Sequence, residues 1–203
     1  MPLQNRVNAY GEIEAIRERG TLMGNRGCLI NARRQLSKAF QLQRWISCVL
    51  EFKGRRHPIM TPGLWTELFF LDEATALAAG HRPCVECRRP AAYRFLKLWN
   101  EANGQSVTRF PHLDAALHAE RLSRTYPLTL ANGVLVSGDD TPYLFLNDRL
   151  HPWTPAGYLA PIAAPPILHQ LTPPSIARTL AAGYLPLLHP SVSNHASDFV
   201  VRS

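Results

Sequence analysis

The spacing of apolar side chains changes along the chain, and each spacing predicts a different element. From residue 44 to residue 52 apolar side chains recur at every second position, and residues 65–70 form another short apolar run. A period of two is typical of a strand, so we expect strands at 44–52 and 65–70. In the first, Cys48 shares a face with Ile46, which predicts that its thiol points toward the core.

Helical signals follow these strands. Asp72 is suited to cap a helix over residues 74–79, and Gly80 is the expected stop. Pro90 suits the first turn of a second helix that ends at Gly104. Further helices are expected from Pro111 and from residues 172–175 to Leu180.

The two ends of the chain have weaker patterns. Residues 1–40 predict an irregular arm, within which Ile13 and Ile16 allow a short helix. Short strands are expected at 133–136 and 143–146, on either side of an acidic turn. Residues 153–166 predict an ordered loop held by its aromatic side chains.

Length and composition place the chain among globular proteins. It has 203 residues, 46% of them hydrophobic and 18% charged, which suits one elaborated domain or two small modules. We expect an α+β fold with a zinc-binding module and arm over 1–105, then a helix and a small strand-rich module over 106–203. No apolar run approaches the roughly 20 residues that span a bilayer, and residues 1–14 lack a signal peptide's apolar segment. A cytoplasmic protein without a membrane partner is expected.

The net charge of +7 indicates a polyanionic partner. Basic residues gather in the first half of the chain, around the cysteines, whereas few follow Pro142. Arginine forks suit phosphate and bind it without reading sequence. The arginines expected to contact nucleic acid are Arg26, Arg55, Arg56, Arg82, Arg88 and Arg89.

Cysteine spacing predicts a metal site. Cys84 and Cys87 lie three positions apart on a proline-stiffened turn, where both thiolates can face one tetrahedral ion. Cys28 and Cys48 are the remaining cysteines, so the four together would complete one structural Zn²⁺ site. His57 or His81 would be the substitute if one thiol were absent from the site. A redox pair would need a thioredoxin-like βαβ context instead, and a lone thiol on an apolar strand is often simply core.

The segment Glu73–Arg88 reads as an alanine-rich helix, a glycine, Arg-Pro-Cys, two residues and a second cysteine. This order resembles the zinc-binding module of Ada-type DNA methyl-phosphotriester repair proteins. The resemblance covers residues 73–90 and implies an Ada-like module in a bacterial protein. It also implies that Cys84 and Cys87 are zinc ligands beside a DNA backbone, with a link to DNA repair.

The function expected from these features is a zinc-binding protein that contacts DNA phosphates. Two alternatives belong to the enzyme class: a metal-dependent nuclease, or a thiolate alkyl acceptor with Cys28 as its nucleophile. A third is a zinc-stabilised adaptor that binds proteins. The sequence indicates neither the DNA structure preferred nor the oligomeric state.

Overall fold

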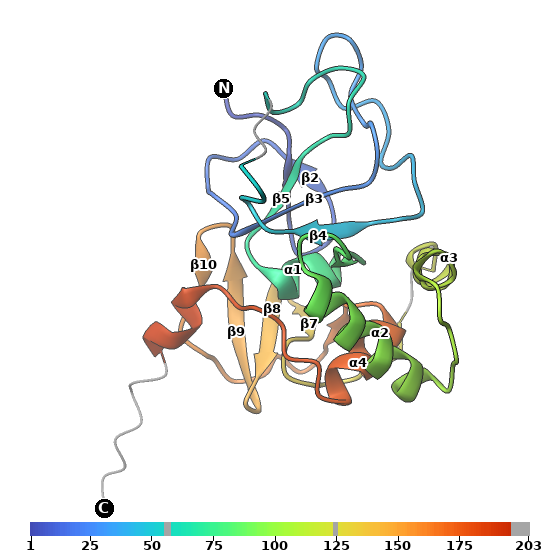
Figure 1. The fold of residues 1–203 in the computed structure, drawn as a ribbon. Helices are drawn as coiled ribbons and strands as arrows, with labels where there is room; N and C mark the ends of the chain where they lie inside the picture. The colour runs from blue at the N-terminus through green and yellow to red at the C-terminus, as the bar shows by residue number, and fades with distance from the viewer. Residues whose placement is uncertain (55–57, 124–125, 196–203) are drawn as a thin grey trace, which may run out of the picture.

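The computed structural model describes residues 1–54, 58–123 and 126–195. It is an α+β fold in which two sheets are separated by a short helix, α1 (Figure 1). Across these residues the first sheet has strand order β2-β1-β5-β3-β4-β6. Its strands are β1 (Arg6–Val7), β2 (Ile13–Glu14), β3 (Leu22–Asn25), β4 (Ile46–Cys48), β5 (Leu68–Phe70) and β6 (Arg82–Pro83).

One face of this sheet forms a core. Val7 and Leu22 both pair with Phe70, and these side chains are buried with Leu68 and Ala76. Because successive residues of a strand point to opposite sides, the neighbouring positions face away from that core. Burial of the apolar set against α1 therefore fixes which side chains remain on the other face.

The opposite face carries a row across four strands. Arg6 pairs with Phe69, Phe69 with Met23, and Met23 with Cys48. All four side chains are partly exposed. We call these residues the open-face row. The prediction that Cys48 and Ile46 share a face fits the register, but Cys48 does not point into the core; the buried position between them is Ser47.

The helices begin and end close to the predicted signals. Asp72 caps α1 (Glu73–Ala78) by accepting a hydrogen bond from the Thr75 N–H. Gly80 and Gly104 follow α1 and α2 with positive φ angles of 77° and 60°, which cost glycine little. The other helices are α2 (Arg89–Asn103), α3 (Phe110–Arg121), α4 (Pro174–Ala181) and the 3₁₀ helix η1 (Pro190–His195).

The second sheet has order β10-β9-β8-β7-β11 in the described part of the chain. The acidic turn between the predicted strands is confirmed: Asp139 and Asp140, both at positive φ, join β7 to β8. The predicted loop at 153–166 is wrong in its first half, because β9 and β10 pair there. The strands are β7 (Leu135–Gly138), β8 (Thr141–Leu146), β9 (Arg149–Thr154), β10 (Gly157–Tyr158) and β11 (His169–Gln170).

The core continues from one part of the chain to the other. Leu77 and Phe95 share a cluster with Val136 and Ile176, and α2 runs beside α4 (Figure 1). Ala74 of α1 packs in a second cluster that includes residues of β7 to β10. The buried interior therefore crosses the boundary predicted at residue 105.

The irregular arm predicted over residues 1–40 contains β1, β2 and β3. Ile13 belongs to β2 and pairs with Val7, so it does not begin a helix. These strands are two to four residues long, too short to repeat an alternating pattern. Among the described residues, no helix combines the length and apolar character needed to cross a membrane.

Candidate metal centre

Three of the four cysteines come together. The Sγ atoms of Cys48, Cys84 and Cys87 all lie within 4.8 Å of one another. Thiolates that share a tetrahedral Zn²⁺ stand about 3.8 Å apart, given Zn–S bonds of about 2.3 Å. The three sulfurs therefore need to move only slightly to bind one ion. Their residue types fit Zn²⁺, for which thiolate is a preferred ligand.

The sheet brings the two cysteine segments together. β4 pairs in parallel with β6, with Ser47 opposite Pro83. The Cys84 N–H then donates to the Ser47 carbonyl oxygen at 2.9 Å. This bond places Cys84 beside the end of β4, where Cys48 lies. A tight turn follows, closed by the Arg88 N–H donating to the Cys84 carbonyl oxygen at 3.0 Å, and it returns Cys87 toward the same point.

Hydrogen bonds converge on the sulfur of Cys84. The Glu86 N–H donates to Cys84 Sγ at 3.4 Å. Bonds from the Cys48 thiol, then from Cys87, lower the pKa of Cys84 to about 2, and the same bond to Cys84 raises the pKa of Cys48. The lowered pKa favours the thiolate of Cys84, which is the form of cysteine that binds a metal.

Arg88, at the end of the cysteine turn, binds side chains of β4 and α1. Its guanidinium is 6% exposed and donates to Glu73 Oε2 at 2.6 Å and to Ser47 Oγ at 3.1 Å. Burial alone would lower the pKa of Arg88, but the hydrogen bond and charge of Glu73 raise it. Arg88 therefore links the cysteine turn to α1 and β4. The expectation that it contacts phosphate is corrected, because its charge is buried and paired.

Arg82 is also an internal residue. It is 2% exposed, and its Nε and Nη2 donate to the two carboxylate oxygens of Asp114, each at 2.8 Å. The guanidinium also lies over the Phe110 ring, 4.7 Å from its centroid. A guanidinium enclosed in this way is not available to a phosphate. Arg82 instead joins β6, just before Cys84, to α3.

Arg26 is likewise buried, at 3% exposure. The Arg26 guanidinium lies 4.1 Å from the centroid of the Trp45 ring, and the Arg121 guanidinium lies 4.4 Å from the same centroid. Burial first, and the charge of Arg121 second, lower the pKa of Arg26 to about 9. Its Nε donates to His81 Nε2 at 3.3 Å. The predicted phosphate contact by Arg26 is therefore corrected as well.

Cys28 does not join the cluster. Its thiol donates to the Ile30 carbonyl oxygen at 3.9 Å, and it is absent from the group formed by the other three cysteines. The four-cysteine site is therefore corrected to three cysteines, and Cys28, the nucleophile of the alkyl-acceptor alternative, lies outside the group that could hold a metal. His81, the suggested substitute, is fully buried between Trp45 and Phe70. His57 lies outside the described residues.

The other predicted nucleic-acid contacts differ in their position. Arg89 is exposed at the start of α2, with its guanidinium 5.2 Å from the centroid of the Tyr93 ring. Arg55 and Arg56 lie outside the described residues. Within the described chain, the three cysteines form the only group of His, Cys, Asp or Glu side chains close enough to share a metal.

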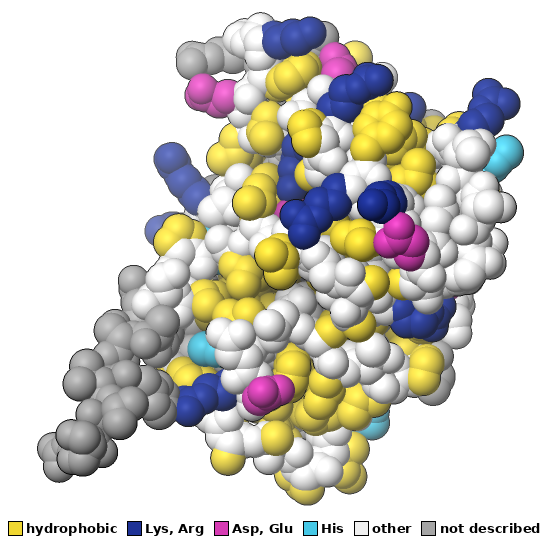
Figure 2. Space-filling view, turned by 60° about the horizontal axis from the view of Figure 1, so that its bottom comes forward, with side chains coloured by type: hydrophobic (Ala, Val, Ile, Leu, Met, Phe, Trp, Pro, Cys, Tyr) yellow, Lys and Arg dark blue, Asp and Glu magenta, His cyan; other side chains and the backbone are white. Residues whose placement is uncertain are grey.

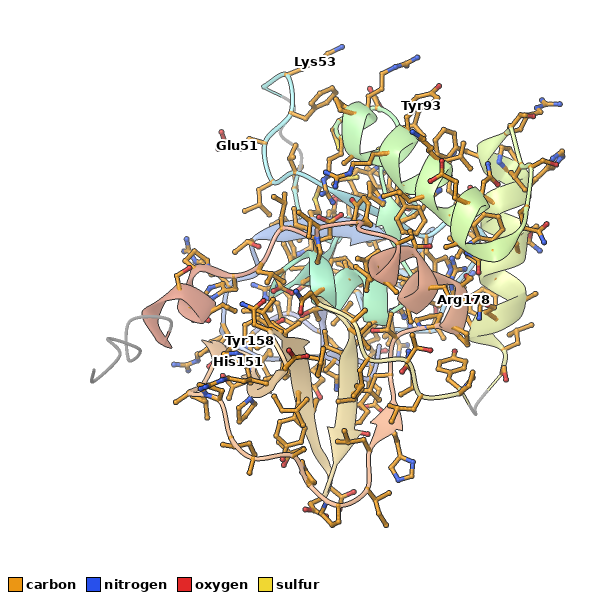
Figure 3. All side chains as sticks on the ribbon, turned by 90° about the horizontal axis from the view of Figure 1, so that it is seen from below. Glu51, Lys53, Tyr93, His151, Tyr158 and Arg178 are labelled. Carbon is orange, nitrogen blue, oxygen red and sulfur yellow. The ribbon has the colours of Figure 1, made fainter. Side chains whose placement is uncertain are left out.

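The polar groups of the second sheet do not join the cysteine cluster. His151 lies on β9 and Tyr158 on β10. In Figure 3 both lie well below Glu51 and Lys53, which follow β4 in the chain. In the described part of the chain, these groups form no cluster of three or more His, Cys, Asp or Glu side chains that could hold a nuclease's metal.

A cavity of about 390 Å³ opens beside the metal candidates. All three cysteines line it, together with apolar side chains from β3, β4 and the segments around them. Arg44, Asn25 and Glu86 are its polar members. We call it the cysteine cavity. The apolar lining residues are Met23, Leu42, Ile46, Val49, Leu50, Phe52 and Trp65.

No protein-family model, curated protein or solved structure matches this chain.

Sequence reasoning missed the acidic partners of the buried arginines. Asp114 lies on α3 and Glu73 on α1, at distances of 32 and 15 residues along the chain from Arg82 and Arg88. Asp114 carried a usable signal: it follows Leu113, and both lie on the buried side of α3. A carboxylate among inward-facing positions needs a partner, and the arginines near the cysteines were the obvious candidates.

Proposed function

We propose that the protein binds Zn²⁺ through Cys48, Cys84 and Cys87. The observation that carries this proposal is the convergence of three sulfur atoms from β4 and the turn after β6 within 4.8 Å. Zn²⁺ bound there would cross-link these segments and act as a Lewis acid toward a further ligand. The chain itself supplies the positioning, through the Cys84 bond to Ser47 and the ion pair of Arg88 with Glu73.

Metal content tests this proposal directly. We expect about one zinc per chain in the purified protein, lost on changing Cys48, Cys84 or Cys87 to serine. Cys28→Ser is the matched control, since its sulfur lies outside the cluster, and it should keep its zinc. Zinc retained in Cys48→Ser, or lost in Cys28→Ser, would contradict the assignment.

The resemblance of residues 73–90 to the Ada-type zinc module supports the same ligands. It also suggests a nucleic-acid partner, which we propose as a second function. The observation that favours it is the set of exposed basic residues in the first half of the chain. These residues could contact phosphates, although the three buried arginines could not. Among the described residues these are Arg17, Arg19, Arg33, Arg34, Lys38, Arg44, Lys53, Arg89, Arg94 and Lys97.

Figure 2 shows Lys and Arg side chains among hydrophobic ones over the upper half of the view, with fewer Asp and Glu. Such a surface would bind phosphates without reading sequence, and its affinity would fall steeply with salt.

Fluorescence anisotropy with a short DNA duplex tests this. We expect binding at low ionic strength that weakens as salt is added, and weaker binding after Arg33→Gln with Arg34→Gln. Arg178→Gln, on α4 in the other half of the chain, should leave it unchanged. Absence of binding at low salt would rule out the nucleic-acid function. The zinc proposal would still stand, because metal content tests it separately.

A further inference from the structure

A tetrahedral Zn²⁺ bound by the three cysteines would take a fourth ligand, and no further His, Cys, Asp or Glu of the described residues lies with them. Zinc sites with three protein ligands characteristically hold a water or substrate in the fourth position. All three cysteines line the cysteine cavity, whose walls are mainly apolar, so a ligand in that cavity would lie beside a metal that they bind. Water bound in such surroundings has few hydrogen-bond partners. A soft donor atom on an apolar body suits both the metal and the walls better.

A second cavity continues from the first. It measures about 850 Å³ and shares Met23 and Leu50 with the cysteine cavity. Its floor includes Arg6 and Phe69, so the two cavities together follow the open-face row from Cys48 to Arg6. Neighbouring strands lie about 4.8 Å apart, which makes the row about 14 Å long from β4 to β1.

The far end of the second cavity carries positive charge. Arg6, Arg17 and Arg19 line it, and the Arg6 guanidinium stacks 4.7 Å from the centroid of the Phe69 ring. Asn5 also lines this end, is 1% exposed, and its Nδ2 donor has no acceptor among the described residues. An anionic ligand group would satisfy that donor and pair with the exposed Arg17 and Arg19.

Two carboxylates also line this cavity, Glu51 and Glu67. Glu67 is 2% exposed, and its Oε2 already accepts a hydrogen bond from the Met60 N–H at 2.7 Å. Glu51 also has an interaction partner. The three arginines outnumber these two carboxylates, so the charge of the lining stays positive.

Resting on the proposed zinc site, we propose that the open-face row binds an organic thiol with an apolar chain and an anionic end. The sulfur takes the fourth coordination position, the chain lies over Met23 and Phe69, and the anionic group meets Arg17 and Arg19. On binding, the S–H bond breaks, a metal–sulfur bond forms, and the proton passes to solvent. A coordinated thiol is deprotonated in this way because the cation stabilises the thiolate.

The experiment uses the full-length protein loaded with Co²⁺, whose visible absorption reports its ligands. The probe is 11-mercaptoundecanoate, whose extended chain is about as long as the row, compared with 2-mercaptoethanol. We expect the long thiol to change the cobalt spectrum and to bind at least about tenfold more tightly. Calorimetry in two buffers of different ionisation enthalpy should detect one proton released per bound thiol.

A matched pair of variants locates the ligand. Leu50 lines both cavities and Leu64 lines neither, although the two are exposed to 48% and 46%. Leu50→Glu should weaken 11-mercaptoundecanoate binding by about tenfold, and Leu64→Glu should not. Arg17→Gln with Arg19→Gln should weaken this probe by about fivefold and leave the neutral 11-mercaptoundecanol unaffected.

The outcomes separate the two proposals. Cysteine-dependent Co²⁺ binding with a spectrum unmoved by either thiol would overturn the thiol site and leave the zinc site standing. Equal affinity for the long and short thiols, or an unchanged response in Leu50→Glu, would overturn the groove. Failure to bind Co²⁺ at all would overturn both.

Discussion

Arg82 and Asp114 form a buried ion pair in which two guanidinium nitrogens donate to two carboxylate oxygens, each at 2.8 Å. The pair joins β6, two residues before Cys84, to α3. Its side chains are 2% and 6% exposed. Removing one charge from such a pair leaves the other buried without compensation, which is strongly unfavourable.

We therefore expect Asp114→Asn to lower the free energy of unfolding by about 3 kcal/mol. The control is Glu101→Gln in the Lys97–Glu101 pair on α2, whose side chains are 75% and 55% exposed. That change should stay within about 0.5 kcal/mol. Urea denaturation of the two variants and the wild type measures both. Equal, small effects would mean that the Arg82–Asp114 pair contributes no more than a surface pair.

Arg88 and Arg89 are neighbours in sequence, but only the substitution of Arg88 is expected to lower zinc affinity. Arg88 ties the cysteine turn to Glu73 and Ser47, while Arg89 is exposed. Loss of a group that orients metal ligands typically costs 10- to 100-fold in affinity. Competition with a chromophoric chelator should therefore show a loss of about that size in Arg88→Gln and none in Arg89→Gln. Matching affinities in the two variants would contradict a positioning role for Arg88.

The arginines also show what the sequence could and could not predict. The strand at Cys48, the Asp72 cap and the closeness of the Cys84 and Cys87 thiols depend on local spacing, and local spacing can be read along the chain. Whether Arg82 and Arg88 face solvent depends on Asp114 and Glu73, which only the tertiary fold brings near them. The clustering of basic residues in the sequence therefore predicted phosphate contacts for three arginines that the fold buries.

The absence of Cys28 from the cysteine cluster has a similar cause. A count of four cysteines matched a complete zinc site, but the count carries no information on where β3 ends. Cys28 follows the end of β3 at Asn25, whereas Cys48 closes the neighbouring antiparallel strand next to β6. Only the strand register, with Ser47 of β4 opposite Pro83 of β6, shows that Cys48 lies beside Cys84.

His81 predicts a loss of stability in acid. Burial first, then the charges of Arg26 and Arg121, hold its pKa well below the ordinary value of 6.5. The unfolded state consequently binds more protons than the folded state below about pH 6.5. The stability contributed by neutral His81 is full above that pH and falls toward the lower folded pKa, by up to about 1.4 kcal/mol per pH unit.

Denaturation at pH 7.0 and 5.5, at the same zinc concentration, tests this for wild type and His81→Gln. The quantity compared is the change in the free energy of unfolding between the two pH values, which should be smaller in the variant than in the wild type. His112→Gln, an exposed position on α3, should keep the wild-type dependence. Parallel slopes in all three proteins would mean that His81 titrates alike in the folded and unfolded states.

Gly24 predicts a link between sheet spacing and metal affinity. It lies in β3, and a Cβ there would come within 2.2 Å of the Ile46 carbonyl oxygen and 2.8 Å of Phe70 Cε2. Backbone cannot move aside as a flexible side chain does, so Gly24→Ala must displace β4, which carries Cys48. We expect a loss of about 1–3 kcal/mol in stability, together with weaker zinc binding.

Gly104→Ala separates the two effects. Its Cβ would meet nothing within 4 Å, but its φ of 60° strains alanine, which costs about 1 kcal/mol. Gly104→Ala should therefore lose stability and keep wild-type zinc affinity, because α2 ends far from β4 in the fold (Figure 1). Chelator competition on both variants decides the matter. Wild-type affinity in Gly24→Ala would show that the position of Cys48 does not depend on the close approach of β3 to β4.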